Sequence, residues 1–531
     1  MSTRHPTIAS GSSTRPQTGE EYLASLRDDR EVYIYGKRIE DVTSHPAYRN
    51  SAATISGLYD SLHDGATNGE IVVPTDTGSG GFTHAFFKVP HTKEDLVEGR
   101  EAIRAWQRQT CGWMGRTPDY KASMIATLGA DPEFFGEFAD NARYWYTRVQ
   151  EEVLHVGHAI VHPPVDRAKG VEQVKDVFVH VDEEVDGGLI VSGAKVVATG
   201  AALTQYCFVS HFGAALGKKE FALIFMAPMN GSGVKLYSRH SYEFAASAAA
   251  SPFDYPLSSR FDENDAILVF DRAFIPWENV LIYDTKKIEE FNVGSYSWGP
   301  RAAFQASTRL EVKLDFIIGL VSKALDVTGA GGFRGVQAQF GEIIAFRNIA
   351  AALRDAMIQE AAPGFGGSMV PNTQYALAYA AAAPGLYSRM RQIIETIIAS
   401  GLIYLNSNAV DFQVPEIKRD LDRFMRGSNG LTAMDRSKVM KALWDSIGSE
   451  FGARHELYEL NYWGQPEKTY LDILSLAEQD GYLAGSRKRA EVFMDSYDLS
   501  GFKTGRLTNP TDVSRIGSDP VNSLAPAGDP R

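Results

Sequence analysis

A series of short apolar runs between two long helical regions is the feature that most limits how this chain can fold. The sequence HPPVD, residues 162–166, interrupts the helical periodicity, because proline fixes its own backbone angle and restricts the residue before it. The next segment, residues 176–199, has apolar stretches on both sides of Asp186 and Gly187, which predicts a hairpin. Further β-like runs continue to about residue 283. The order helical, β, helical predicts an α+β fold.

Helical patterns dominate on either side of this β segment. Before it, Asp131 is a suitable N-cap and Pro132 suits the first helical position, with apolar residues following at spacings of three or four. After about residue 300, the segments 307–329 and 387–406 have the broad apolar faces of a helical bundle. We therefore expect a flexible tail over 1–18, a helical domain over 19–157, a β domain over 158–283, a helical bundle over 284–502 and a second tail over 503–531.

Composition and charge argue against several classes of protein. The net charge of -13 over 531 residues disfavours binding to nucleic acid or to an anionic membrane surface. The two cysteines, Cys111 and Cys207, provide no disulfide framework and cannot supply four thiolates to an iron–sulfur or zinc site. The N-terminus lacks the apolar core of a secretory signal, and no run of ~18 apolar residues occurs. We expect a cytoplasmic protein.

Two patterns suggest ligand sites but lack the context that such sites need. TGAGGFRG, residues 328–335, follows a helix rather than a strand and has the wrong glycine spacing for dinucleotide binding, so we interpret it as a helix end and a turn. His155, His158 and His162 would share a face of one helix, but Pro163 disfavours helical backbone at His162. We therefore expect no metal site there. With no Walker A motif either, the sequence indicates no NAD(P)-binding domain.

The loop GRTPDY, residues 115–120, has two interpretations. Pro118 pushes Thr117 out of the helical region, so a helix begins only after Arg116. In one interpretation Thr117 or Asp119 caps that helix, and the arginine is a solvated surface group. In the other, Arg116 and Tyr120 form the edge of a ligand pocket. The loop by itself leaves both open.

Five stretches in a fixed order together resemble one protein family. They are GRTPDY (115–120), HAIVHPPVDR (158–167), AKVVATG (194–200), PLSSRFDENDAILVFDRAFIPWENV (256–280) and GSEFGARHELYELNYWG (448–464). They resemble the large oxygenase component of the 4-hydroxyphenylacetate 3-monooxygenase family, two-component phenol hydroxylases that also include chlorophenol and tyrosine-derivative hydroxylases. The resemblance extends from about residue 19 to about residue 500.

The resemblance implies a fold, a cofactor and a reaction. The fold is acyl-CoA-dehydrogenase-like, with a C-terminal helical bundle that assembles a homotetramer. The enzyme is a flavin-dependent aromatic monooxygenase that uses FAD as FADH2, supplied by a separate NAD(P)H-flavin reductase, with O2 as co-substrate. It hydroxylates a para-substituted phenol ortho to its hydroxyl through a flavin C4a-hydroperoxide. The phenol can be 4-hydroxyphenylacetate, a chlorophenol or a tyrosine derivative, free or carrier-tethered.

The resemblance also implies roles for individual residues. Arg116, Tyr120 and His158 are the expected catalytic residues and phenol contacts: His158 as base or hydrogen-bond acceptor, Arg116 as the cation beside the phenolate. Ser210 and His211 are expected on a substrate loop. His162 departs from the smaller polar residue usual in relatives and could alter the flavin-site hydrogen bonds. The expected flavin contacts are His158, Ala159, Ile160, Pro164, Val165, Asp166, Arg167, Thr199, Gly448, Ser449, Glu450 and Phe451.

Other functions remain as alternatives. A flavin-dependent lyase or dehydrogenase acting on an acyl-CoA would share the fold. The lyase pairs its flavin with an iron–sulfur cluster, for which two cysteines are too few. No glutamate base signature of a dehydrogenase is apparent. A non-catalytic scaffold is disfavoured by the intact set of Arg116, Tyr120 and His158.

Overall fold

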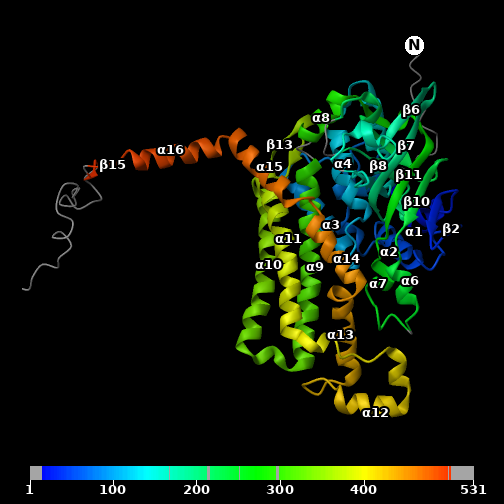
Figure 1. Cartoon of the computed structure of the whole chain (residues 1–531), viewed down its shortest axis with the longest axis vertical. Helices are drawn as coiled ribbons and strands as arrows, with labels where there is room; N and C mark the ends of the chain where they lie inside the picture. Colours follow the sequence, from blue (N-terminus) through cyan, green and yellow to red (C-terminus); the bar gives the residue numbers. More distant parts are fainter. Residues whose placement is uncertain are drawn as a thin grey trace, which may run out of the picture. The chain divides into compact units, whose positions relative to one another are not determined.

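The computed structural model describes residues 15–166, 168–211, 216–249, 251–294, 298–499 and 501–503 (Figure 1). The chain divides into two compact units, residues 1–464 and 465–531. Among the residues described, no helix combines the length and the apolar character needed to cross a membrane. Most of the two predicted tails lies outside the described ranges.

The first part of the larger unit contains five α-helices, and its tryptophans Trp106, Trp113 and Trp145 are fully buried. These helices are α1 (Gly19–Ser25), α2 (Arg49–Asp60), α3 (Lys93–Gln109), α4 (Pro118–Ala130) and α5 (Ala139–Glu152). The sequence predicted one continuous helix starting after Asp131, but the structure breaks this segment in two. Residues Pro132–Phe138 form a 3-10 segment with a kink at Gly136, whose φ of 58° is a conformation that glycine adopts without strain, and α5 begins only at Ala139.

Two sheets follow, one of which draws strands from two regions of the sequence. The six-stranded sheet has the order β2-β1-β10-β11-β7-β6, and the four-stranded sheet the order β12-β9-β8-β5. Asp186 and Gly187 form the predicted two-residue turn between β6 and β7. Their bounds are β1 (Glu31–Ile34), β2 (Lys37–Ile39), β5 (Val156–Ala159), β6 (His180–Val185), β7 (Gly188–Thr199), β8 (Tyr206–Val209), β9 (Leu223–Pro228), β10 (Val234–Ser238), β11 (Asp265–Pro276) and β12 (Val280–Tyr283).

The N-terminal region is not purely helical. Strand β1 pairs in parallel with β10, about two hundred residues later, through contacts such as Val32 with Leu236. A further two-stranded pair joins β3 (Val72–Pro74) to β4 (Phe82–His84). Local periodicity over four residues is too short to distinguish such strands from loops, since the pairing partner lies elsewhere in the chain.

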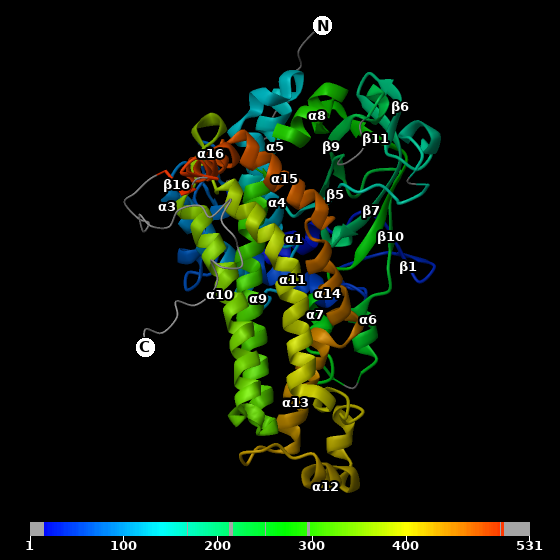
Figure 2. The same cartoon turned by 60° about the vertical axis from the view of Figure 1, so that its left-hand side comes forward.

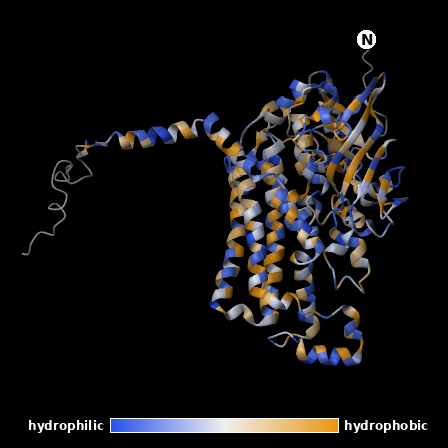
Figure 3. Cartoon of the chain, in the orientation of Figure 1, coloured by the Kyte–Doolittle hydropathy of each residue, from blue (hydrophilic) through white to orange (hydrophobic). Residues whose placement is uncertain are grey.

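The C-terminal part of the larger unit is the predicted helical bundle (Figure 2). Hydrophobic positions recur along its long helices (Figure 3). Helix α9 packs on α4 and α3 as well as on its bundle neighbours, so it joins the two helical regions. Gly329, with a φ of 68°, ends α9, as the interpretation of TGAGGFRG requires. The helices of the bundle are α8 (Thr285–Gly294), α9 (Trp298–Thr328), α10 (Arg334–Gln359), α11 (Thr373–Ile398), α12 (Pro415–Phe424), α13 (Ala433–Ile447) and α14 (Glu450–Asn461). Two short helices, α6 (Tyr242–Ser247) and α7 (Ser258–Phe261), lie earlier in the chain, between β10 and β11.

The helical, β, helical order of the larger unit confirms the predicted α+β fold class. A short pair of strands, β13 (Ala362–Pro363) and β14 (Met369–Val370), lies between α10 and α11. The smaller unit contains α15 (Pro466–Gln479), α16 (Tyr482–Met494) and the strand pair β15 (Tyr497–Asp498) and β16 (Gly501–Phe502). The exact domain bounds remain a prediction.

Candidate active site

The loop GRTPDY holds Arg116 on backbone fixed from both sides. Helix α4 begins at Pro118 with Thr117 in the N-cap position. The first interpretation of the loop, that it starts a helix, is therefore correct. The carboxylate of Glu263, just before β11, accepts hydrogen bonds from the backbone N–H groups of Gly115 (2.9 Å) and Arg116. The Arg116 carbonyl in turn accepts a hydrogen bond from Nε2 of His155 at 3.0 Å. These contacts fix the direction in which the arginine side chain leaves the loop.

The Arg116 side chain is not a solvated surface group, because three tyrosine rings surround it. Its guanidinium carbon lies 4.0 Å from the ring centroid of Tyr120, 4.9 Å from that of Tyr458 and 4.7 Å from that of Tyr462. Nη1 also donates a 2.6 Å hydrogen bond to the hydroxyl of Tyr458. Cation–π contacts of this kind are strong when water is excluded. The loop therefore combines a helix start with a buried cation.

Two of these tyrosines come from a motif whose role in the site the sequence did not predict. Tyr458 lies in α14 and Tyr462 directly after it, within the stretch 448–464, for which only residues 448–451 were assigned a contact. A tyrosine every four residues on a helix places both rings on one face. This spacing was the available signal. Gly115 permits the close approach, since a Cβ there would lie 2.0 Å from the Tyr458 hydroxyl oxygen.

His158 reaches the same cluster from strand β5. Its ring centroid lies 5.6 Å from that of Tyr120. Burial lowers the pKa of His158 well below its usual value, and the neighbouring cations Lys121 and Arg116 lower it further. The imidazole is therefore neutral near pH 7 and available to accept a hydrogen bond or a proton. The three predicted phenol contacts, Arg116, Tyr120 and His158, thus lie together although they come from a loop, a helix and a strand.

Asp119 does not face this cluster. Its buried carboxylate accepts hydrogen bonds from the hydroxyl of Thr117 and, at 3.3 Å, from the amide of Gln305 in α9. Burial raises the pKa of Asp119 to about 6, in spite of these two donors. Asp119 therefore fastens the start of α4 to the bundle.

Ser210 and His211 lie buried at the end of β8, next to the segment that follows β5. The backbone N–H of Ser210 donates to the carbonyl of Ala159 at 3.2 Å. Nδ1 of His211 lies 2.8 Å from Nε2 of His162, and the amine of Lys195 lies 3.0 Å from the same nitrogen. Burial lowers the pKa of His162 to about 2, with further lowering by Lys195 and His211. His162 thus makes a hydrogen-bonded contact between the predicted flavin segment and the predicted substrate loop.

The three histidines considered for a metal point to different partners. His155 bonds to the Arg116 carbonyl, His158 packs on Tyr120 and His162 contacts His211. Within the described ranges, no group of three His, Cys, Asp or Glu side chains is arranged to hold a metal ion.

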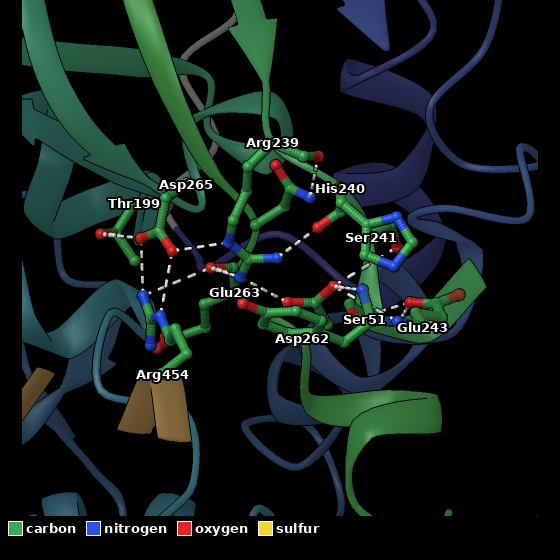
Figure 4. A network of polar contacts seen from close by, with 12 residues as sticks. Ser51, Thr199, Arg239, His240, Ser241, Glu243, Asp262, Glu263, Asp265 and Arg454 are labelled. Carbon is green, nitrogen blue, oxygen red and sulfur yellow. Dashed lines mark hydrogen bonds and ion pairs between the residues drawn. The ribbon is translucent and has the colours of Figure 1, made fainter. Parts of the chain in front are cut away.

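A charged network connects the predicted flavin contact Thr199 to the Arg116 loop (Figure 4). The Thr199 hydroxyl donates to Asp265 at 2.6 Å, and Arg454 of α14 donates two hydrogen bonds to the same carboxylate. Nη1 of Arg454 also lies 3.9 Å from the carboxylate of Glu263. Arg239 adds hydrogen bonds to Asp262 and Asp265. The network ties strand, loop and helix together at one point.

The remaining predicted flavin contacts fall into two groups. Pro164, Val165 and Asp166 are exposed, and Arg167 lies outside the described residues. Ser449 is the N-cap of α14 and accepts a hydrogen bond from the N–H of Gly452, after Gly448 has ended α13. Glu450 is exposed, whereas the side chain of Phe451 is core, packed on Trp113 and His455. Only the backbone of Phe451 is therefore free to contact a ligand.

The surface beside the first group suits a flat aromatic cofactor with polar edges. Val161, which pairs with Val196 of β7 through an isolated bridge, is 56% exposed, Val197 is 60% exposed and Val165 is 45% exposed. Nearby, Nδ1 of His162 is buried and has no hydrogen-bond partner among the described residues. An apolar surface next to an unpaired polar atom is what an isoalloxazine ring would cover.

Comparison with known proteins agrees with this geometry. The families described as "4-hydroxyphenylacetate 3-hydroxylase N terminal" and "C terminal" match residues 18–282 and 293–491. The chain is 52% identical to a 4-hydroxyphenylacetate 3-monooxygenase oxygenase component of Pseudomonas aeruginosa, covering 95% of this chain and 97% of that one. It is 50% identical to a 4-nitrophenol 2-monooxygenase oxygenase component of a Rhodococcus species, covering 94% and 96%.

A solved structure gives the same result. The crystal structure of a 4-hydroxyphenylacetate 3-monooxygenase oxygenase component, complexed with FAD and 4-hydroxyphenylacetate, superposes with a TM-score of 0.84 at 30% identity. The match covers 90% of this chain and 99% of that one. With both family halves matched in order and over nearly the whole length, this chain belongs to the 4-hydroxyphenylacetate 3-hydroxylase family.

Proposed function

We propose that this chain is the oxygenase component of a two-component FADH2-dependent monooxygenase that hydroxylates a para-substituted phenol ortho to its hydroxyl. The observation that carries this proposal is the convergence of Arg116, Tyr120 and His158 in one cluster, in which Tyr120 is buried and the other two are partly buried. A phenol is attacked by an electrophilic oxygen far more readily as its phenolate. A buried cation beside a neutral imidazole is suited to hold that phenolate.

Each of the three residues has a separate task at the phenol oxygen. Arg116 is charged at every working pH and stabilises the negative charge, with its tyrosine neighbours excluding water. His158, neutral in this environment, accepts the hydrogen bond or the proton of the phenol hydroxyl. Tyr120 packs against both and offers its hydroxyl to the substrate. Positioning and desolvation are thus the protein's contribution to the reaction.

The flavin would be held by residues 158–160, 164–167, Thr199 and 448–451, next to the exposed valines. When bound as FADH2, it supplies the activated oxygen from O2 that is transferred to the phenol ring. Thr199 and Arg116 belong to one connected network, so the two binding regions have a fixed spacing. A dry junction between them matters because water would divert the oxygen to hydrogen peroxide.

The substrate is a phenol whose para substituent binds near Ser210 and His211. Relatives of almost equal identity are named for 4-hydroxyphenylacetate and for 4-nitrophenol, so overall similarity does not select the substituent. A chlorophenol or a carrier-tethered tyrosine derivative remains compatible with the same phenol-binding residues. A panel of para-substituted phenols, compared by kcat/KM, would identify the preferred class.

Two partners accompany this function. A separate NAD(P)H-flavin reductase supplies FADH2, and the helical bundle assembles a homotetramer in a cytoplasmic enzyme. The exposed hydrophobic side chains of the bundle region, such as Phe333, Ile403 and Phe424, support assembly. Sedimentation should give a tetramer, and an active monomer would contradict this assignment. The alternative of an acyl-CoA lyase or dehydrogenase is disfavoured, because a tyrosine-lined cation suits a phenol rather than a thioester.

Product analysis tests the function directly. The purified chain with FAD, NADH and a phenol should form no catechol until an unrelated flavin reductase is added. Full turnover with NADH and no reductase would contradict the two-component assignment. Formation of hydrogen peroxide alone, with every phenol in the panel, would contradict the hydroxylase assignment.

A further inference from the structure

Lys121 is a buried amine beside the proposed phenol site. It follows Tyr120 on α4 and is 1% exposed, and its Nζ lies 4.3 Å from the centroid of the Tyr120 ring. Its hydrogen-bond partner is the thioether sulfur of Met124 at 3.2 Å, with no oxygen partner in the described part of the chain. A thioether is a weak acceptor. Packing alone would be served as well by an alkyl side chain, so the amine needs another explanation.

Among the residues that the structure describes, the groups around this amine include no anion that could neutralise an ammonium. The ionisable groups that act on it or lie against it are Arg116 from the loop, Tyr120 from its own helix, His158 from β5 and Cys207 from β8. Burial raises the pKa of Cys207 to about 12, so this thiol stays protonated. Burial, followed by the charge of Arg116, lowers the pKa of Lys121 well below its usual value. Burial without a neighbouring anion therefore favours the neutral form of this amine.

We propose that Lys121 is the group that takes the phenol proton when the substrate binds. The O–H bond of the phenol breaks and a new N–H bond forms on Nζ, leaving a phenolate between the ammonium of Lys121 and the guanidinium of Arg116. No oxidation state changes in this step. The inference rests on the proposed function and adds a residue to it: His158 orients the hydroxyl by accepting its hydrogen bond, and Lys121 keeps the proton.

Intrinsic basicity favours the amine over the imidazole as the final proton acceptor. An unperturbed lysine binds a proton more tightly than an unperturbed histidine by about 4 pKa units. Both groups are buried and both lie near Arg116, which disfavours their charged forms in the same direction. A phenolate beside Lys121 and His158 stabilises the protonated form of either residue. The more basic group, Lys121, therefore holds the proton.

The flavin-free chain with 4-nitrophenol as a chromophoric probe tests this step. The experiment is run at a pH below that at which free 4-nitrophenol ionises, and nitrophenolate absorbance reports the bound ionised fraction. The parent should bind the probe with a clear nitrophenolate band. Lys121→Met should lower the bound phenolate-to-phenol ratio by ~10-fold or more, one pKa unit being a factor of ten. Met124→Leu, which removes only the sulfur partner, should keep the parent spectrum, and His158→Gln should keep most of the band.

Lys121→Arg separates a proton acceptor from a simple positive charge. Arginine restores the cation but cannot accept a proton. The variant should bind nitrophenolate and release one proton to solvent per probe bound, as measured by calorimetry in two buffers of different ionisation enthalpy, whereas the parent should release almost none. This comparison also decides the matter if Lys121→Met does not fold.

An unchanged band in a folded Lys121→Met variant, or proton release by the parent equal to that of Lys121→Arg, would overturn the role of Lys121 and leave the hydroxylase assignment intact. Loss of the nitrophenolate band in His158→Gln would instead identify His158 as the residue that takes the proton. A parent that binds no phenol in any form would instead count against the proposed function.

Discussion

The carboxylate of Glu263 accepts a hydrogen bond from the backbone N–H of Arg116, 147 residues earlier in the chain. The same carboxylate accepts the N–H of Gly115, and both oxygens are thereby used on one loop. Glu263 is buried, and burial raises its pKa against the opposing effect of Arg454 and the two N–H donors. This contact directs the guanidinium into the tyrosine cluster.

Glu263→Gln should loosen that loop, because an amide offers only one acceptor oxygen for two buried donors. A hydrogen bond to a charged group is worth roughly 1.5–3 kcal/mol, so the ratio of hydroxylated product to hydrogen peroxide should fall about tenfold or more. Glu243→Gln is the matched control. Its buried carboxylate accepts the N–H groups of Asn50 and Ser51 in the same way, away from the loop. Equal uncoupling in both variants would reduce the role of Glu263 to general stability.

Arg116→Ala should uncouple the enzyme rather than silence it. Without the buried cation the phenolate loses roughly 2–4 kcal/mol of stabilisation, which corresponds to a ~30- to 1000-fold slower hydroxylation. Flavin reduction occurs on the reductase, so NADH consumption should continue and the oxygen should appear as hydrogen peroxide. Product and peroxide are measured side by side. Arg143→Ala, at an exposed surface ion pair, provides the comparison. If Arg116→Ala is as coupled as the parent, the arginine is structural.

His158 should give the parent an unusually low acid limit. Burial and the nearby cations lower the pKa of His158 well below the ordinary value of ~6.5, so its neutral, functional form persists as the pH falls through that value. The pH–rate profile of the parent should stay flat there and decline only at lower pH. His158→Gln should lose that acid limb together with much of the rate. A parent profile that already falls near the ordinary imidazole value would contradict the buried position of His158.

Tyr458→Phe should weaken phenol binding without abolishing turnover. The substitution removes the hydroxyl that accepts the 2.6 Å hydrogen bond from Arg116 but keeps the ring over the guanidinium. The loss of one charge-assisted hydrogen bond in a buried site is worth roughly 1.5–3 kcal/mol and should appear mainly as a raised KM. Tyr462→Phe removes a buried hydroxyl that has no hydrogen-bond partner in the described part of the chain, so its effect should be much smaller. Equal effects on KM would show that the hydrogen bond is unimportant.

The sequence by itself determined the features that depend on neighbouring residues. Asp186 and Gly187 form the predicted turn because they are turn-forming residues between two apolar runs. Gly329 ends α9 because glycine adopts a positive φ without strain. The start of α4 at Pro118 follows from the fixed φ of proline. The helical, β, helical order follows from hydrophobic periodicity, and the resemblance of five ordered motifs identified the family.

Only the tertiary structure decided which residues meet. Glu263 and Tyr458 carry no local pattern that names Arg116 as their partner, since their hydrogen bonds to it cross 147 and 342 residues of sequence. Lys121 is close to Arg116 in sequence, but its burial is visible only in the tertiary structure. Strand β1 could likewise be recognised only from its pairing with β10. Gly136 interrupts a segment that the hydrophobic periodicity around it predicts to be one continuous helix. Hydrophobic periodicity predicts which face of each segment is buried. The site forms where buried faces of different segments meet, and local periodicity does not specify which segments those are.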